Sequence, residues 1–186
     1  MKYLAIVAVM LSLGVPAVYA QDERPVKMTF SGTNVATTIN LRPGTITDEH
    51  QSAGRGSLGA FTFRELHADQ GGAPPSPTCS GPHFLVVAGA GVFRFQDGSL
   101  LSVGITEGEP GDGCVNLTAG VALLTVKYQI TGGTGRFEGA SGALTMTATQ
   151  MPVLRNAANM PALLAFTGEF EGTIARADQE SQDGQR

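Results

Sequence analysis

The segment at residues 129–142 (QITGGTGRFEGASG) constrains the fold most strongly, because it places a glycine-rich turn between two strand-like segments. Apolar residues occupy every second position from Leu124 to Ile130 before the turn, and again from Leu144 to Ala148 after it. Successive side chains of a strand point to opposite faces, so this pattern predicts an antiparallel hairpin with one apolar face. In the turn we expect positive φ angles at Gly132, Gly133 and Gly135, and a strand bend at Gly139 and Gly142.

The same alternation recurs along most of the chain, with β-branched and aromatic residues at the apolar positions. Glycine, proline and polar residues gather between these runs and predict turns or loops at residues 31–34, 44–56, 108–113 and 151–161. The expected strands cover residues 26–30, 35–41, 61–64, 84–87, 92–95, 101–105, 124–130, 144–149 and 164–174. About eight strands without an amphipathic helix predict an all-β fold, an eight-stranded antiparallel barrel, with a two-sheet sandwich as the alternative.

Both ends of the chain differ from this pattern. Residues 1–20 hold one Lys, an apolar run from Leu4 to Val15 and small residues before Gln21, which is typical of a cleaved signal peptide and predicts a secreted or periplasmic protein. Gly14 and Pro16 shorten the run, which disfavours the alternative of an uncleaved membrane anchor. Residues 21–176 then form the barrel domain. Residues 177–186 contain no apolar side chain larger than alanine and are expected to be a disordered tail.

Charge and cysteine content restrict the partners and the compartment. The chain has 12 basic residues, one of them in the leader, against 16 acidic ones, and no basic cluster, so nucleic acid is not an expected partner. The only two cysteines, Cys79 and Cys114, lie in Gly/Pro-rich segments of a chain expected to be exported. We therefore predict a disulfide between them, in preference to a reactive or metal-binding thiol.

Three segments carry a family resemblance: SLLSVGITEG at 99–108, YQITGGTGRFEGASG at 128–142 and FTGEFEGTI at 166–174. In this order they resemble the calycin-like barrels of the allene oxide cyclase and dirigent superfamily. The shared turn motif comprises Gly132, Gly133, Thr134, Gly135, Phe137, Gly139 and Gly142. The resemblance implies an eight-stranded barrel, often a homotrimer, with an apolar cavity along its axis for a small, mostly apolar molecule.

The catalytic residues of that superfamily do not carry over to this chain. Its cyclases have a Glu-x-Asn arrangement on the first strand, where this sequence has Lys27, Thr29 and Ser31. Dirigent proteins use Asp, Tyr and Arg in the cavity, but Arg64, Asp97 and Tyr128 lack the flanking motif. The resemblance therefore implies a fold and no assigned catalytic residue.

Candidate chemistry elsewhere is weak. The three histidines, His50, His67 and His83, have acidic neighbours in Asp48, Glu49, Glu65 and Asp69, yet their spacing matches no known metal-ligand pattern. Because they fall in or beside expected loops, we expect them to face solvent, and no metal or cofactor is predicted. The alternation also places Arg64, Arg94, Glu169 and Glu171 on the outer face, opposite the phenylalanines.

Three functions remain open. The first is a secreted barrel that binds a small apolar or amphipathic molecule. The second is an isomerase, a cyclase-like enzyme or a protein that directs stereochemistry, which requires at least one polar or ionisable residue inside the barrel. The third is a structural or interaction protein. One fold serves many functions, so the fold alone does not decide among them.

Overall fold

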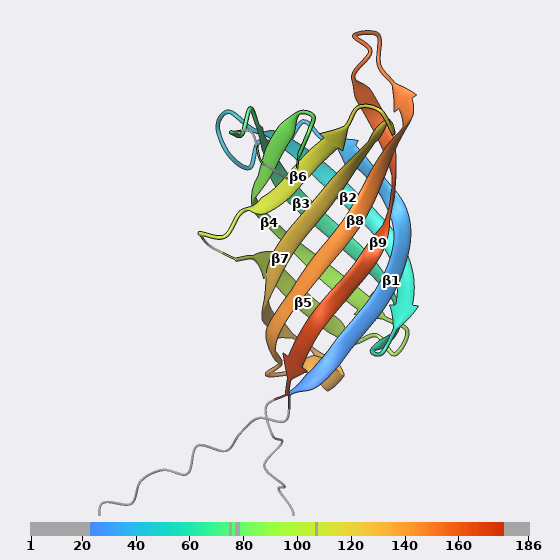
Figure 1. Cartoon of the computed structure of the whole chain (residues 1–186). Coiled ribbons are helices and arrows are strands. Elements are labelled where there is room, and N and C mark those ends of the chain that lie inside the picture. The colour runs from blue at the N-terminus through green and yellow to red at the C-terminus, as the bar shows by residue number, and fades with distance from the viewer. Residues whose placement is uncertain (1–22, 75, 77–78, 107, 177–186) are drawn as a thin grey trace, which may run out of the picture.

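The structure is a computed structural model that describes residues 23–74, 76, 79–106 and 108–176. The predicted signal peptide and the predicted C-terminal tail lie outside these residues. Within them the chain forms nine strands and one short 3-10 helix (Figure 1). Their bounds are β1 Arg24–Ala36, β2 Ile46–Gly56, β3 Gly59–Gly71, β4 His83–Phe95, β5 Leu100–Ile105, β6 Gly111–Asn116, β7 Val121–Gly133, η1 Gly135–Phe137, β8 Ser141–Arg155 and β9 Pro161–Ala175.

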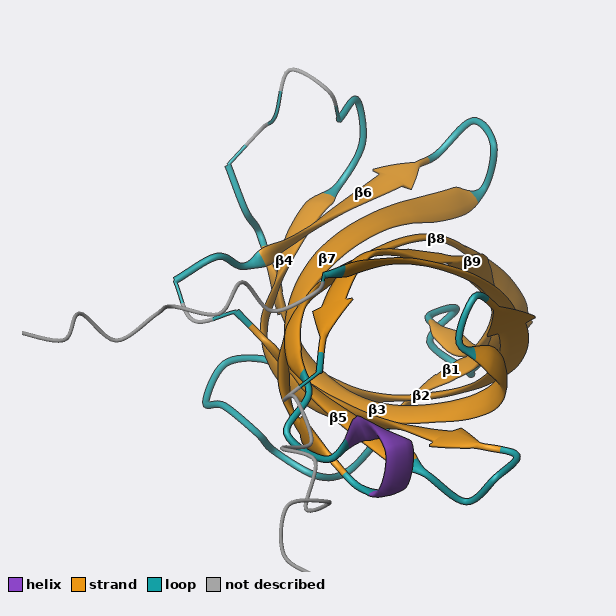
Figure 2. Ribbon diagram, turned by 90° about the horizontal axis from the view of Figure 1, so that it is seen from below, coloured by secondary structure: helices purple, strands orange, loops and turns teal. Residues whose placement is uncertain are grey.

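The strands close into an antiparallel barrel. The sheet runs in the order β3-β2-β1-β9-β8-β7-β5-β4-β6, and a further pairing of β3 with β4 joins its two ends. The short strands β5 and β6 both pair with β4 and with β7, so together they occupy one position in the wall. The wall therefore has eight positions, and Figure 2 shows the closed ring. This confirms the predicted barrel over the sandwich.

Two sequence predictions near the N-terminus are wrong. β1 runs through residues 31–34, where a turn was expected, and the chain leaves the sheet after Ala36, so residues 37–41 are not a strand. Residues 46–56, predicted as part of a loop, form β2. Its inward residues include Asp48, His50 and Ser52. A strand whose buried face is polar lacks the apolar alternation on which the prediction depended.

Two further loops are also shorter than expected. β8 continues to Arg155 and β9 begins at Pro161, so most of the predicted loop at 151–161 is a hairpin that projects above the barrel (Figure 1). Pro152 stands at a shift in strand register and Pro161 begins a strand, two positions that tolerate a missing N–H donor. Similarly, β6 begins at Gly111, inside the segment 108–113 that was expected to be a loop.

The glycine-rich turn closes the lower end of the barrel as drawn in Figure 1. Gly132, Gly135, Gly139 and Gly142 have positive φ angles. Gly139 lies in the turn before β8, so the strand bend predicted there is wrong. Gly133 does not, and the prediction of a positive φ there is wrong. A side chain at Gly133 would instead collide with Phe137 and with the Leu100 carbonyl, because a Cβ atom there would lie 2.6 to 2.7 Å from them.

Thr134 and Phe137 fix this turn against the barrel. The Thr134 N–H donates to the Leu100 carbonyl, and the Thr134 hydroxyl accepts from the Leu100 N–H. Phe137, in η1, is completely buried and its ring packs 4.7 Å from that of Phe95. The turn motif therefore has a structural role as the floor of the apolar core.

The upper end is held by a disulfide. Cys79 and Cys114 are bonded, as predicted, with Cα atoms 5.5 Å apart. Cys114 lies in β6 and pairs with His83 at the start of β4, so the disulfide ties the proline-rich segment before β4 to the wall. Within the described residues, no helix is long and apolar enough to cross a membrane.

Candidate functional site

The interior of the barrel changes character along its axis. Its lower half is filled by packed aromatic rings, among them Phe63 and Phe93, which stack with centroids 4.3 Å apart, and Phe170, which lies 5.0 Å from Phe93. Phe30, Phe61, Phe95 and Phe137 complete this cluster, and all seven are buried. Among the described residues the lower half is therefore a packed core, which leaves no room there for the apolar cavity along the whole axis that the resemblance implies.

In the upper half, β1, β2 and β3 turn polar side chains inward. The inward positions of β2 hold Asp48, His50 and Ser52, and those of β3 hold Glu65, His67 and Asp69. β1 adds Asn34 and β8 adds Gln150. Other strands contribute apolar residues such as Val86 and Leu124, so the upper interior has one polar wall.

Glu65 is the centre of a fully buried network. It accepts a 2.7 Å hydrogen bond from the Tyr128 hydroxyl through Oε1. Its other oxygen, Oε2, lies 3.5 Å from His50 Nδ1 and 3.7 Å from His67 Nδ1. Burial alone would raise the pKa of Glu65, but the two imidazoles more than offset this and lower the pKa to about 2. Glu65 is therefore a carboxylate that faces both histidines with its negative charge.

The two histidines respond differently to this carboxylate. Burial lowers the pKa of His50 and outweighs the attraction of Glu65. Burial also acts to lower the pKa of His67, but Glu65, Asp69 and Asp48 together raise it to about 9. His67 thus experiences a more negative environment than His50.

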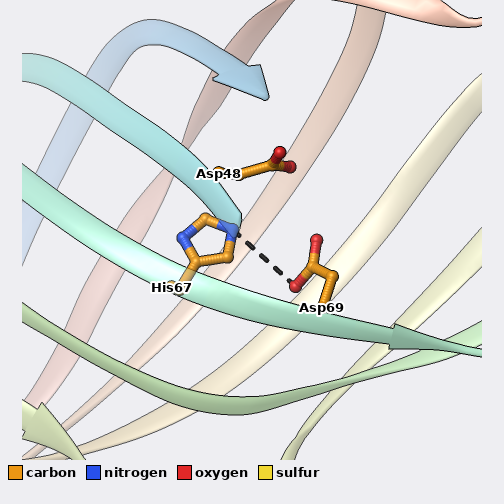
Figure 3. A group of neighbouring side chains, drawn as sticks. All are labelled: Asp48, His67 and Asp69. Atoms are coloured by element: carbon orange, nitrogen blue, oxygen red, sulfur yellow. Dashed lines mark ion pairs between the residues drawn. The ribbon is translucent and has the colours of Figure 1, made fainter. Parts of the chain in front are cut away.

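Asp48, His67 and Asp69 form a compact group beside this network (Figure 3). One ligand atom from each lies within 4.8 Å of the others, and His67 Nε2 is 3.8 Å from Asp69 Oδ1. Asp48 pairs with His67 across β2 and β3, while the β3–β4 register shifts between Ala68 and Asp69. Asn34 Nδ2 donates a 3.0 Å hydrogen bond to Asp48 Oδ2 and orients that carboxyl.

Several buried polar atoms of this wall make no hydrogen bond within the described part of the chain. They include Asn34 Oδ1, His50 Nε2, Glu65 Oε2, His67 Nε2, Asp69 Oδ1 and Gln150 Nε2. Burial raises the pKa of Asp69 to about 7, and burial likewise raises the pKa of Asp48. Because buried polar groups are normally paired, so many open donors and acceptors in one place indicate a site for a polar group that comes from outside the chain.

A cavity of about 680 Å³ opens at the upper end of the barrel, above this wall. Asp48, Gln150, Arg155 and Asn156 contribute polar groups to its lining. Its apolar residues include Phe84, Val115, Leu117, Val121, Met160 and Leu164. Leu117 and Met160 are more than half exposed, so the apolar lining extends to the rim. The cavity combines an apolar wall with a few hydrogen-bonding groups, which is typical of small-molecule sites.

A second hollow, of about 790 Å³, lies on the outer surface. Ile39 and Leu41 from the loop after β1 form one side, and Val92 of β4 forms part of the other. Three charged residues line it: Arg64 and Glu49 pair at 2.6 Å, and the Glu65 side chain belongs to the buried network inside the barrel. Because its charged groups already have partners, this outer hollow has fewer free hydrogen-bonding groups for a polar ligand than the cavity at the upper end, the mouth cavity.

The predicted solvent exposure of the histidines is wrong for His50 and His67, which are 0% and 3% exposed. That prediction depended on the loop expected at residues 44–56, which contains His50, and on the expectation that His67 lies beside a loop. His83 lies apart from the cluster and pairs with Asp112 at 2.6 Å. A sequence signal did exist, because Asp48-His50-Ser52 and Glu65-His67-Asp69 each alternate with period 2.

The other candidates lie on the outer surface, as predicted. Arg64 and Arg94 are exposed, and Glu169 and Glu171 are about half exposed and pair with Lys27. Of the three positions compared with dirigent cavity residues, only Tyr128 is inside the barrel. Asp97 pairs with Arg136 near the lower turn. Sequence reasoning missed Glu65 as the partner of Tyr128, because nothing in the chain indicates a contact across 63 residues.

The described residues thus define an all-β, closed barrel with a packed lower half and a polar, open upper half. No protein-family model matches the sequence, and no curated protein matches it. A solved structure, that of a pterocarpan synthase dirigent protein, is similar to 86% of this chain over 90% of its own length, with 13% sequence identity and a TM-score of 0.42. The fold class stands on the strand pairing of the chain itself.

Proposed function

We propose that this chain is an exported barrel protein that binds a small amphipathic molecule in the cavity at its upper end. The observation that carries this proposal is the cavity itself, which has apolar walls and reaches the carboxyl of Asp48 and the amide of Gln150, whose Nε2 makes no hydrogen bond within the described residues. The apolar body of the ligand lies against Phe84, Leu117 and Leu164, and its polar head faces Asp48 and Gln150. Its volume of about 680 Å³ is in the range of small-molecule sites.

Export is part of the proposal, supported by the leader-like residues 1–20 and by the disulfide. The proposal also includes membership of the dirigent-like superfamily and the homotrimer that the resemblance implies. Native mass spectrometry of the protein purified from its host tests these points together. It reports loss of the leader, the number of subunits and the mass of any retained molecule.

A probe titration tests the binding proposal. We expect a naphthalene fluorophore with a hydrogen-bonding amide head to bind saturably, with one probe per chain. Ala36 borders the cavity, so Ala36→Trp should fill the mouth and abolish binding. Ala143 is exposed on β8 and pairs near its lower end, so Ala143→Trp serves as the matched control and should leave binding unchanged. Equal loss in both variants, or none in either, contradicts the proposal.

A second candidate function is acid–base catalysis on the bound molecule, as in an isomerase or cyclase. The observation that favours it is the set of buried proton-carrying groups next to the cavity, Asp48, His67 and Asp69, connected through Glu65 to Tyr128. A ligand that co-purifies can be incubated with the protein in deuterated water. Deuterium on a carbon atom of the ligand, absent with His67→Gln, supports catalysis, and an unchanged isotope pattern supports binding alone.

A further inference from the structure

The group formed by Asp48, His67 and Asp69 has the composition of a metal site with open coordination positions. It offers one imidazole nitrogen and two carboxylates from two neighbouring strands. Donor atoms that share an ion at about 2.1 Å lie roughly 3 to 4 Å apart. The three donor atoms already lie within 4.8 Å of one another, so small side-chain rotations suffice to bring them to bonding distance.

The orientation of His67 is the second observation. Its Nδ1 faces the Glu65 carboxylate at 3.7 Å, which leaves Nε2 directed toward Asp69. His67 is 3% exposed, and its Nε2 makes no hydrogen bond. A metal-bound histidine usually donates its other ring N–H to a carboxylate, which fixes the ring and increases the basicity of the ligand nitrogen. Glu65 is the carboxylate that faces the other ring nitrogen of His67, and Asn34 orients Asp48 by donating a hydrogen bond to it.

The charges of the wall are also unbalanced. The groups that face this site are the carboxyls of Asp48, Glu65 and Asp69, the imidazoles of His50 and His67, and the Tyr128 hydroxyl. Three carboxyls thus share the space with two imidazoles, and no Lys or Arg side chain pairs with them in the described residues. A bound cation would give the unbonded oxygen of Asp69 a partner.

We propose that Asp48, His67 and Asp69 bind one divalent transition-metal ion. An imidazole ligand favours ions such as Zn²⁺, Fe²⁺ or Ni²⁺ over Ca²⁺ and Mg²⁺, which prefer oxygen ligands alone. Three protein ligands leave at least one coordination position open. Asp48 also borders the mouth cavity, so the ion lies next to the cavity. The metal site stands on its own contacts and does not depend on the organic ligand.

The test is calorimetric titration of the chelator-treated, tag-free chain with Zn²⁺. We expect one ion per chain, and binding weakened tenfold or more by Asp48→Asn, His67→Gln and Asp69→Asn. His83→Gln and Asp112→Asn are the matched controls, because this histidine–aspartate pair lies outside the group, and they should retain the affinity. Circular dichroism of each variant confirms that the barrel is folded.

A measurement on the unsubstituted chain keeps the test decisive if the variants fold poorly. Co²⁺ bound by one imidazole and carboxylates in a site of low coordination number gives a visible absorption band, which excess Zn²⁺ should remove. Absence of saturable binding of Zn²⁺, Co²⁺ and Mn²⁺ overturns the proposal. So does full affinity in all three site variants, or loss of binding only in the His83→Gln and Asp112→Asn controls.

Discussion

The lower and upper halves of the barrel interior are formed by the same strands, except that β5 and β6 share one position, but they are filled in opposite ways. On β3 the inward residues change from Phe61 and Phe63 to Glu65 and His67. On β8 they change from Leu144 and Met146 to Gln150. The lower half thus buries rings against rings, whereas the upper half buries polar groups, several of which make no hydrogen bond.

This difference indicates a division of roles within one barrel. Burial of apolar side chains is the main favourable term in folding, and the aromatic half supplies most of it. Burial of polar groups without partners is unfavourable, so the upper half reduces stability unless an outside group binds there. The lower half therefore stabilises the fold that holds the upper half open.

The largest effect should come from the aromatic half. Phe93 is completely buried among Phe61, Phe63 and Phe170, so Phe93→Ala should lower the free energy of unfolding by about 3 to 5 kcal/mol. Urea denaturation measures this loss. Val92→Ala, on the same strand but partly exposed, is the control and should cost much less. Similar losses for both variants would show that the lower half is not a tightly packed core.

The disulfide should have the next largest effect, because it restrains the upper end. Replacing Cys79 and Cys114 together by Ser should lower stability by about 2 to 4 kcal/mol, mainly because the unfolded chain is no longer cross-linked. Denaturation with and without reductant provides the comparison. Reductant should leave the double variant unchanged, and an equal response of both proteins to reductant would contradict the account.

Breaking the buried network should cost somewhat less. Glu65→Gln keeps the shape and an acceptor for Tyr128 but removes the charge that serves His50 and His67. We expect a loss of roughly 1 to 3 kcal/mol, because the two buried imidazoles lose the charged group that they face. Glu49→Gln removes a carboxylate of the same type from the outer surface, where its pair with Arg64 should contribute little. A Glu65 variant as stable as the Glu49 variant would mean that the network does not hold the upper wall together.

The smallest effect, which depends on pH, should be at His83 on the outer surface. Its ring nitrogens face the Asp112 carboxylate and the Pro74 carbonyl, so the protonated ring satisfies both acceptors. These hydrogen bonds raise the pKa of His83 in the folded chain, and the one to Asp112 contributes most. Its contribution to stability is therefore complete below the ordinary histidine pKa of about 6.5 and is lost as the pH rises through the folded pKa.

Denaturation of the unsubstituted chain and of Asp112→Asn across this pH range checks the His83 prediction. The unsubstituted chain should be the more stable of the two in mild acid, and the difference should shrink in alkali. A difference that grows with pH would contradict the assignment.

The sequence predicts the apolar half of this molecule well and the polar half poorly. Runs such as 124–130 and 144–149 alternate visibly, because one face meets the aromatic core, and the strands found there match the prediction. β2 was not predicted, because its buried residues Asp48 and His50 are polar and resemble the solvent-exposed face of a segment. Hydrophobic patterning detects burial only where the buried side is apolar. The polar wall also brings together residues from different strands, and their contacts depend on strand register.

The central claim is that the upper half of the barrel, and neither the lower half nor the outer hollow, receives the small molecule. Amide chemical shifts of the ¹⁵N-labelled chain, recorded during titration with the amide-headed naphthalene probe, test this claim most directly. We expect saturable shifts at Ile46, Ala122 and Leu164, which border the mouth cavity, while Phe93 in the aromatic core and Val92 at the outer hollow stay unchanged. Shifts centred on Val92 and Leu41, or spread through the aromatic half, would contradict it.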